Sequence, residues 1–142
     1  MSTHALTSYF SRELDGENLE EVGHFWRKFD GHPTGHGYDL KRVLQARQFE
    51  TLWELVGAVT NGLRKNIRGK NYNWMFVPVD PHTTLHLSAE FSYELSLVDQ
   101  DGGMPRGGAW GLPYDVRVVV KQKGQTLYDG LLNDYIPEDP SE

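Results

Sequence analysis

The stretch LHLSAEFSYELSL, residues 85–97, alternates apolar and polar side chains without interruption. Successive side chains of a β-strand point to opposite faces of a sheet, so this pattern predicts a long strand with one buried face and one polar face. A helix would scatter the same apolar residues around its whole surface. The side chains expected to face the core are Leu85, Leu87, Ala89, Phe91, Tyr93, Leu95 and Leu97.

A second strand is predicted immediately before this stretch. Residues 74–79, WMFVPV, are apolar and β-prone, and residues 80–83 are suited to a turn. Pro78 lacks a backbone N–H, which favours an edge position for this strand. We therefore expect residues 74–79 and 85–97 to form a hairpin.

The C-terminal part of the chain predicts a second hairpin. Val116, Val118 and Val120 share one face of a strand, and Lys123-Gly124 turns the chain into a strand at 126–128. The two hairpins together predict a four-stranded antiparallel sheet.

Before residue 69 the apolar spacing is helical. Asp15 is a candidate N-cap for a first helix, in which Leu19, Val22, Phe25 or Trp26, and Phe29 recur at helical spacing. Asp30-Gly31 supplies its end. This helix has about four turns.

A longer helical segment is predicted to begin at Asp39, with a kink or break around residues 45–48. Asn61-Gly62 and Gly69 are two candidate end points. One apolar stripe runs along the second part of the segment, formed by Leu52, Val56, Val59, Leu63 and Ile67.

Helices that precede strands in this way are typical of an α+β domain. The sequence thus predicts two N-terminal helices packed on one face of the four-stranded antiparallel sheet. Their apolar stripe should meet the inner face of residues 85–97. We assign residues 1–133 to a single domain and residues 134–142 to an acidic, flexible C-terminal tail.

Composition narrows the class of protein. The chain has 142 residues, a net charge of −6 and no cysteine, which excludes disulfides, Cys-ligated metals and thiol catalysis. No apolar run approaches the roughly 18 residues of a membrane span, and no secretory signal is recognised at the start. We expect a cytoplasmic protein that has no membrane partner.

Positive charge gathers in one segment. Arg64, Lys65, Arg68 and Lys70 could bind the phosphates of a nucleic acid. Cations also stabilise the last turn of a helix through its dipole, and Gly69 would suit such a helix end. Nucleic-acid binding is therefore an alternative prediction for this cluster.

The histidines raise the question of a metal site. Two groups combine carboxylate and imidazole: His32 and His36 beside Asp30, and His82 and His86 beside Asp80. Spacing of this kind brings two rings together on a helix, whereas the first group lies in a glycine-rich stretch and the second runs into a predicted strand. We expect no metal and no cofactor, and a histidine-dependent metalloenzyme is the third functional prediction.

No nucleophile, phosphate-loop or dinucleotide motif occurs in the chain. Glu90 and Glu94 share one face of a strand, but side chains at that spacing are about 13 Å apart, too far for paired-carboxylate catalysis. A solvated sheet face explains them. We accordingly expect no catalytic residues.

The connection at residues 99–113 is longer than hairpin loops usually are. It is either a binding loop or a crossover that packs Trp110 and Leu112 into the core. As a binding loop it would present Met104, Arg106 and Trp110, since arginine and tryptophan are enriched at interaction hot spots. The leading prediction is a small non-enzymatic protein-interaction module, such as an inhibitor, an adaptor or an immunity-type partner.

Overall fold

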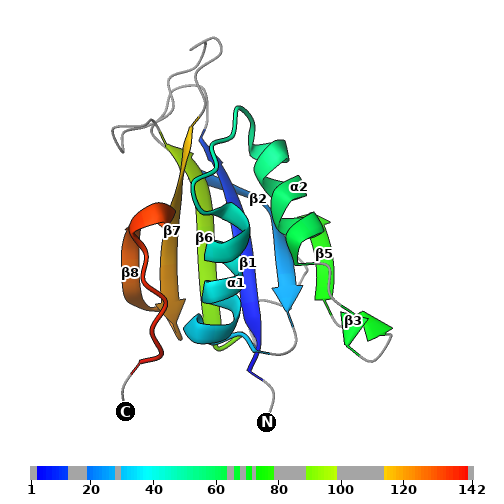
Figure 1. Ribbon diagram of the computed structural model, residues 1–142, viewed down its shortest axis with the longest axis vertical. Helices are drawn as coiled ribbons and strands as arrows, with labels where there is room; N and C mark the ends of the chain where they lie inside the picture. The colour runs from blue at the N-terminus through cyan, green and yellow to red at the C-terminus, as the bar shows by residue number, and fades with distance from the viewer. Residues whose placement is uncertain are drawn as a thin grey trace.

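The computed structural model describes residues 3–12, 19–27, 30–63, 66–67, 70–71, 73–78, 89–98 and 114–140. Two helices lie against one face of a six-stranded mixed sheet with the order β5-β2-β1-β6-β7-β8 (Figure 1). Its strands are β1 (Ala5–Arg12), β2 (Leu19–Arg27), β5 (Asn73–Pro78), β6 (Phe91–Val98), β7 (Asp115–Gln122) and β8 (Gln125–Leu131). A separate ribbon pairs β3 (Asn66–Ile67) with β4 (Lys70–Asn71).

The α+β class, with helices and strands in two layers, is confirmed, but the four-stranded antiparallel sheet is wrong. An N-terminal hairpin adds β1 and β2, which pair antiparallel with Ala5 opposite Arg27. β1 also pairs parallel with β6, Ala5 lying opposite Phe91, so the sheet is mixed. Residues 5–12 and 19–27 therefore supply inner strands of the sheet rather than a covering helix.

The predicted first helix is wrong in its described part, because residues 19–27 form β2. β2 lies between β1 and β5, and its side chains at residues 24–26 are buried on both faces of the sheet. Phe25 belongs to the core beneath the helices, while the adjacent Trp26 is buried on the opposite face. A strand buried on both faces loses the period of two, and apolar neighbours then mimic helical spacing.

The hairpin expected between residues 74–79 and 85–97 is also wrong. β5 pairs with β2, and β1 and β2 lie between β5 and β6. The edge position expected from Pro78 is confirmed, since β5 ends the sheet.

The predicted facing of the long strand is confirmed within β6, where Phe91, Tyr93, Leu95 and Leu97 are all buried in the core. Ala89, also predicted to face the core, precedes β6 and is half-buried. On the other face Ser92 and Glu94 are half-buried, and Ser96 is buried. The β7–β8 hairpin is confirmed as well, with positive φ angles at Lys123 and Gly124 that are characteristic of a type I′ turn. Residues 85–88 lie outside the described part.

The long helical segment is broken, as expected. A five-residue π-helix, η1 (Pro33–Gly37), leads into α1 (Tyr38–Leu44), and α2 (Leu52–Gly62) follows the break. α2 begins at a side-chain cap, in which the Glu54 N–H donates to Thr51 Oγ1 over 3.2 Å. It ends at the earlier of the two candidate positions.

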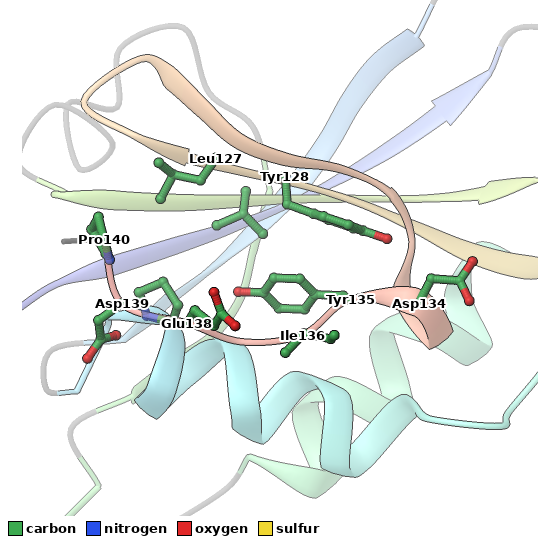
Figure 2. Close-up of a pocket in the computed structure, with 10 residues that line it drawn as sticks. Leu127, Tyr128, Asp134, Tyr135, Ile136, Glu138, Asp139 and Pro140 are labelled. Carbon is green, nitrogen blue, oxygen red and sulfur yellow. The ribbon is translucent and has the colours of Figure 1, made fainter.

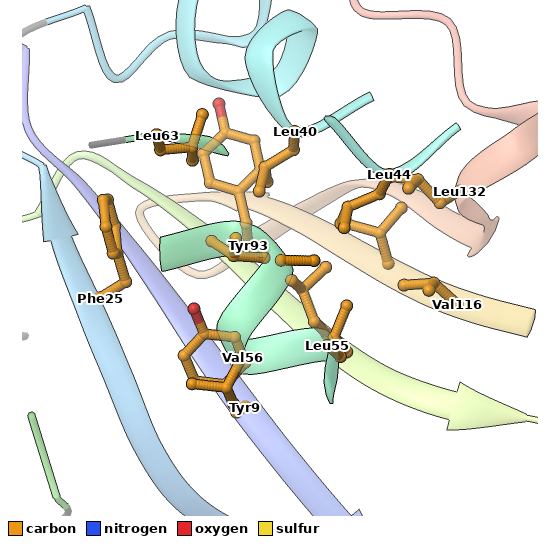
Figure 3. Close-up of a cluster of buried hydrophobic side chains, with 14 of the residues drawn as sticks. Tyr9, Phe25, Leu40, Leu44, Leu55, Val56, Leu63, Tyr93, Val116 and Leu132 are labelled. Carbon is orange, nitrogen blue, oxygen red and sulfur yellow. The ribbon is translucent and has the colours of Figure 1, made fainter. Parts of the chain in front are cut away.

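The helices cover the middle of the sheet. Leu55 and Val56 of α2, Leu63 at its C-terminal cap, and Leu40 and Leu44 of α1 pack against Tyr9, Phe25 and Tyr93 of the sheet (Figure 3). Leu132, in the short helix η3 (Leu132–Asp134), and Tyr135 complete this core. Residues 134–140, predicted to belong to a flexible tail, thus carry a core aromatic. No helix among the described residues is long and apolar enough to cross a membrane.

Candidate functional site

A surface groove runs between β8 and the chain that follows η3. We call residues 135–140 the C-terminal segment and the groove of about 600 Å³ the C-terminal groove. Figure 2 shows Leu127 and Tyr128 on the strand side and the C-terminal segment on the other. The lining residues are Pro33, Val120, Leu127, Tyr128, Asp134, Tyr135, Ile136, Glu138, Asp139 and Pro140.

Side chains of the helical layer hold the C-terminal segment in place. The Asp139 carboxylate accepts hydrogen bonds from the Thr34 N–H over 3.0 Å and from the Thr34 hydroxyl over 2.8 Å. The Lys41 ammonium donates to the carbonyl of Tyr135 and to that of Asn133, 3.2 Å away. The groove is therefore preformed, and a ligand would not need to order this wall.

The lining carries negative charge: Asp134, Glu138 and Asp139 are the charged residues among the lining set. Burial acts to raise the pKa of Asp139, but the Thr34 hydrogen bonds and nearby His32 outweigh it and lower that pKa below its ordinary value. Asp139 is thus a carboxylate at neutral pH.

Two tyrosines form the floor of the groove, with ring centroids 5.0 Å apart. The Tyr128 hydroxyl donates to the Leu131 carbonyl over 2.8 Å. Tyr135 is only 3% exposed, and its hydroxyl has no hydrogen-bond partner in the described part of the chain. Burial, and then the charge of Asp139, raise the pKa of Tyr135 to about 12, so the phenol stays protonated at neutral pH.

Exposed apolar side chains flank the groove on both sides. Leu127 of β8 is 39% exposed, and Ile136 of the C-terminal segment is 69% exposed. β8 is also an edge strand of the sheet. An apolar pair on a preformed surface beside a sheet edge is suited to contact with another chain.

A buried polar network joins the helical layer to the sheet close to Tyr135. His36 of η1 is fully buried, with Nε2 2.6 Å from Thr7 Oγ1 and Nδ1 3.4 Å from Arg27 Nη1. A guanidinium only donates, so Nδ1 accepts and Nε2 carries the proton that is donated to Thr7. Burial, and then the Arg27 charge, lower the pKa of His36 well below its ordinary value, so the ring is neutral.

The other contacts of Arg27 and His36 are also made within the protein. Arg27 also forms an ion pair with Asp39 of α1. Phe25 stacks on the His36 ring at 6.1 Å, and Tyr93 meets the ring edge-on at 4.8 Å. This arrangement fixes η1 and α1 on β1, β2 and β6, and it leaves no face of His36 open to a ligand.

The residues predicted to bind a partner, Met104, Arg106 and Trp110, lie outside the described residues, as do Leu112 and the rest of the connection 99–113. They stay a prediction. Of the basic cluster, Arg64, Lys65 and Arg68 also lie outside, and Lys70 belongs to β4. For Lys70 the helix-dipole explanation is wrong, because α2 ends at Gly62 and Lys70 lies in a strand. For the other three cations it stays untested.

The histidine groups are only partly described, since His82, His86 and Asp80 lie outside the described residues. His36 is buried, whereas Asp30 is exposed. Within the described ranges no three His, Asp or Glu residues gather as a metal site would require.

The two glutamates that share a strand face contact neighbouring side chains. Glu94 forms an ion pair with Lys121 at 2.9 Å, and Glu90 accepts a hydrogen bond from Gln122 at 3.4 Å.

Sequence reasoning missed the C-terminal groove. The available signal was the apolar pair Tyr135-Ile136 inside an otherwise acidic stretch. Leu131-Leu132 directly before it was a second sign that the chain still contributes to the core.

Comparison of the chain with family models, with curated proteins and with solved structures finds no match. The functional proposal therefore depends on the residues and their geometry alone.

Proposed function

We propose that this protein is a small protein-interaction module without a catalytic role, and that its partner docks in the C-terminal groove. The observation that carries the proposal is the preformed groove itself, with Leu127 and Ile136 exposed on its opposite walls. Apolar side chains at a rigid concave surface give contact area without an ordering cost.

The position of the groove also supports an extended binding partner. One wall is β8, an edge strand, and the other is an extended run of chain held by Thr34 and Lys41. A peptide segment of a partner could lie between these walls and contact Leu127 and Ile136 together. The connection 99–113, with Met104, Arg106 and Trp110, is the second proposed contact.

Nucleic-acid binding through Arg64, Lys65, Arg68 and Lys70 remains the alternative proposal. Its basis is the sequence cluster, and the described contacts add nothing to it. A histidine-dependent metalloenzyme is the third proposal, and no described contact favours it.

The test is capture of partners from the native source, with identification by mass spectrometry. The wild-type protein is compared with Leu127→Ala/Ile136→Ala and with Gln125→Ala/Thr126→Ala, a control pair on exposed positions of the same strand. We expect a partner that is retained by wild type and control and is weakened about tenfold or more by the groove variant. Absence of any specific partner, or equal capture by all three proteins, would contradict the proposal.

A further inference from the structure

We infer that the C-terminal groove receives a lysine or arginine side chain from a basic, extended segment of the partner protein. This inference rests on the proposed function and names the chemistry of the partner. It is carried by the charge of the groove and by the buried hydroxyl of Tyr135.

The charge of the groove favours a ligand of positive charge. Asp134, Glu138 and Asp139 line it together with no basic residue. From Gly124 to Glu142 the sequence contains no lysine, arginine or histidine. A negatively charged ligand would be repelled, whereas a cation would be attracted into the groove.

The hydroxyl of Tyr135 is the second observation. It has no hydrogen-bond partner among the described residues although the side chain is more than nine-tenths buried. Figure 2 shows it pointing along the groove towards the side of Glu138 and Asp139. Buried hydroxyls are normally hydrogen-bonded, so a partner atom from outside the described chain would complete this one.

A cationic side chain satisfies both observations at once. Its N–H groups can donate to the Tyr135 oxygen and to the Glu138 carboxylate. Asp139, whose two carboxylate oxygens already accept from Thr34, adds negative charge to the lining. A ligand that only accepts hydrogen bonds could use the Tyr135 proton, but it would then lie in a groove whose charged lining residues are all acidic. The hydroxyl and the charges are therefore complementary only to a donor cation.

The apolar rim favours a side chain over a free ion. Lysine and arginine carry a methylene stem below the charge, which can pack on Leu127 and Ile136 while the charged end reaches the carboxylates. The nearby ring of Tyr128 can add a cation–π contact. The groove of about 600 Å³ also exceeds the space that a single ion needs.

The probe is a fluorescent peptide of seven residues that alternates lysine and valine, compared with one that alternates glutamate and valine. We expect binding of the lysine peptide alone, an affinity that falls as salt is added, and NMR amide shifts centred on Leu127, Tyr135 and Ile136. A lysine peptide that shifts no groove residue would overturn the inference.

Three variants separate groove binding from general attraction to an acidic protein. Asp134→Asn/Glu138→Gln should weaken the lysine peptide about tenfold, since it removes two groove charges. Glu50→Gln/Glu54→Gln changes the net charge equally, at exposed positions of another surface, and should leave the affinity within about twofold. Tyr135→Phe should weaken binding about threefold to tenfold through loss of the hydroxyl. Equal weakening by the two acid-pair variants would overturn the inference.

The two proposals fail in different ways. If the native partner is lost from Leu127→Ala/Ile136→Ala but the lysine peptide does not bind, the interaction module stands and the cationic chemistry is wrong. If the lysine peptide binds at the groove but no partner is captured, the cationic site stands and the interaction module is wrong.

Discussion

Arg27 of β2 and Asp39 of α1 form a buried ion pair, with the guanidinium Nη1 2.6 Å from the carboxylate Oδ2. It joins the sheet to the helical layer, and Nη1 also contacts His36. Both side chains are about nine-tenths buried. Their other charged neighbours are farther away, Arg42 at 3.8 Å from Asp39 and Asp30 at 4.0 Å from Arg27, so this pair supplies most of the charge compensation.

Removing one member of this pair should be strongly destabilising. In Arg27→Met the Asp39 carboxylate stays buried but loses its shortest ion pair. We expect the free energy of unfolding to fall by about 3–5 kcal/mol. The double variant Arg27→Met/Asp39→Leu should recover most of that loss, because neither charge remains. Urea denaturation of both single variants and the double variant measures the coupling. A double variant no more stable than Arg27→Met would contradict this account.

His36 should make the protein sensitive to acid. Its pKa is lowered by folding, so below the ordinary value of 6.5 the unfolded chain binds a proton that the folded chain does not. The contribution of neutral His36 to the free energy of unfolding is therefore fully present above pH 6.5. It falls as the pH decreases from there towards the folded pKa, by at most about 1.4 kcal/mol per pH unit. His36→Gln should be less stable at neutral pH but show a flatter pH profile between 6.5 and 5. An unchanged slope in that variant would assign the acid sensitivity to other groups.

Two glycines should respond in opposite directions to alanine. A Cβ on Gly31 would lie 2.6–2.7 Å from the backbone of His4 and Ala5, so Gly31→Ala forces two chain segments apart and should cost about 1–3 kcal/mol. A Cβ on Gly57 of α2 meets nothing within 4 Å, and Gly57→Ala should stabilise by about 0.5–1 kcal/mol through helix propensity. Thermal melts distinguish the two, and destabilisation by Gly57→Ala would contradict the packing of α2.

The hydrogen bonds from Thr34 to Asp139 should control the order of the C-terminal segment. Asp139→Asn removes the charge that accepts both bonds, so amide hydrogen exchange in residues 135–140 should accelerate. Glu138→Gln is the matched control, since it neutralises the adjacent acid without touching Thr34. The folded pKa of Asp139 is lowered, so this contribution is present above the unfolded pKa of 3.8 and lost as the pH falls through the folded value. Equal exchange in the two variants would show that Thr34 does not hold the segment.

Trp110 tests the predicted binding loop independently of the C-terminal groove. In a binding loop, Trp110→Ala should leave the melting temperature nearly unchanged and weaken partner capture by about 2 kcal/mol or more. In a core crossover, the same change should lower the melting temperature by several degrees. The indole fluorescence of the free protein would then already be blue-shifted and protected from quenchers. That fluorescence signature would rule out the binding role.

Local patterns in the sequence determined the parts of the fold that bury a single face. The alternation of β6 places Phe91 and Leu95 in the core because one face of that strand is apolar and the other polar. Gly124 favours the β7–β8 turn because glycine accepts positive φ, and Pro78 restricts β5 to an edge because it lacks an N–H. Each of these signals acts within a few residues of chain.

Only the tertiary structure decided the identity of β2 and the existence of the C-terminal groove. Phe25 and Trp26 of this inner strand are buried on opposite faces of the sheet, and consecutive apolar residues do not distinguish that setting from a helix. The groove depends on Asp139 binding Thr34, 105 positions away along the chain. No local pattern encodes such a pairing, because it forms only when packing of the core brings both segments together.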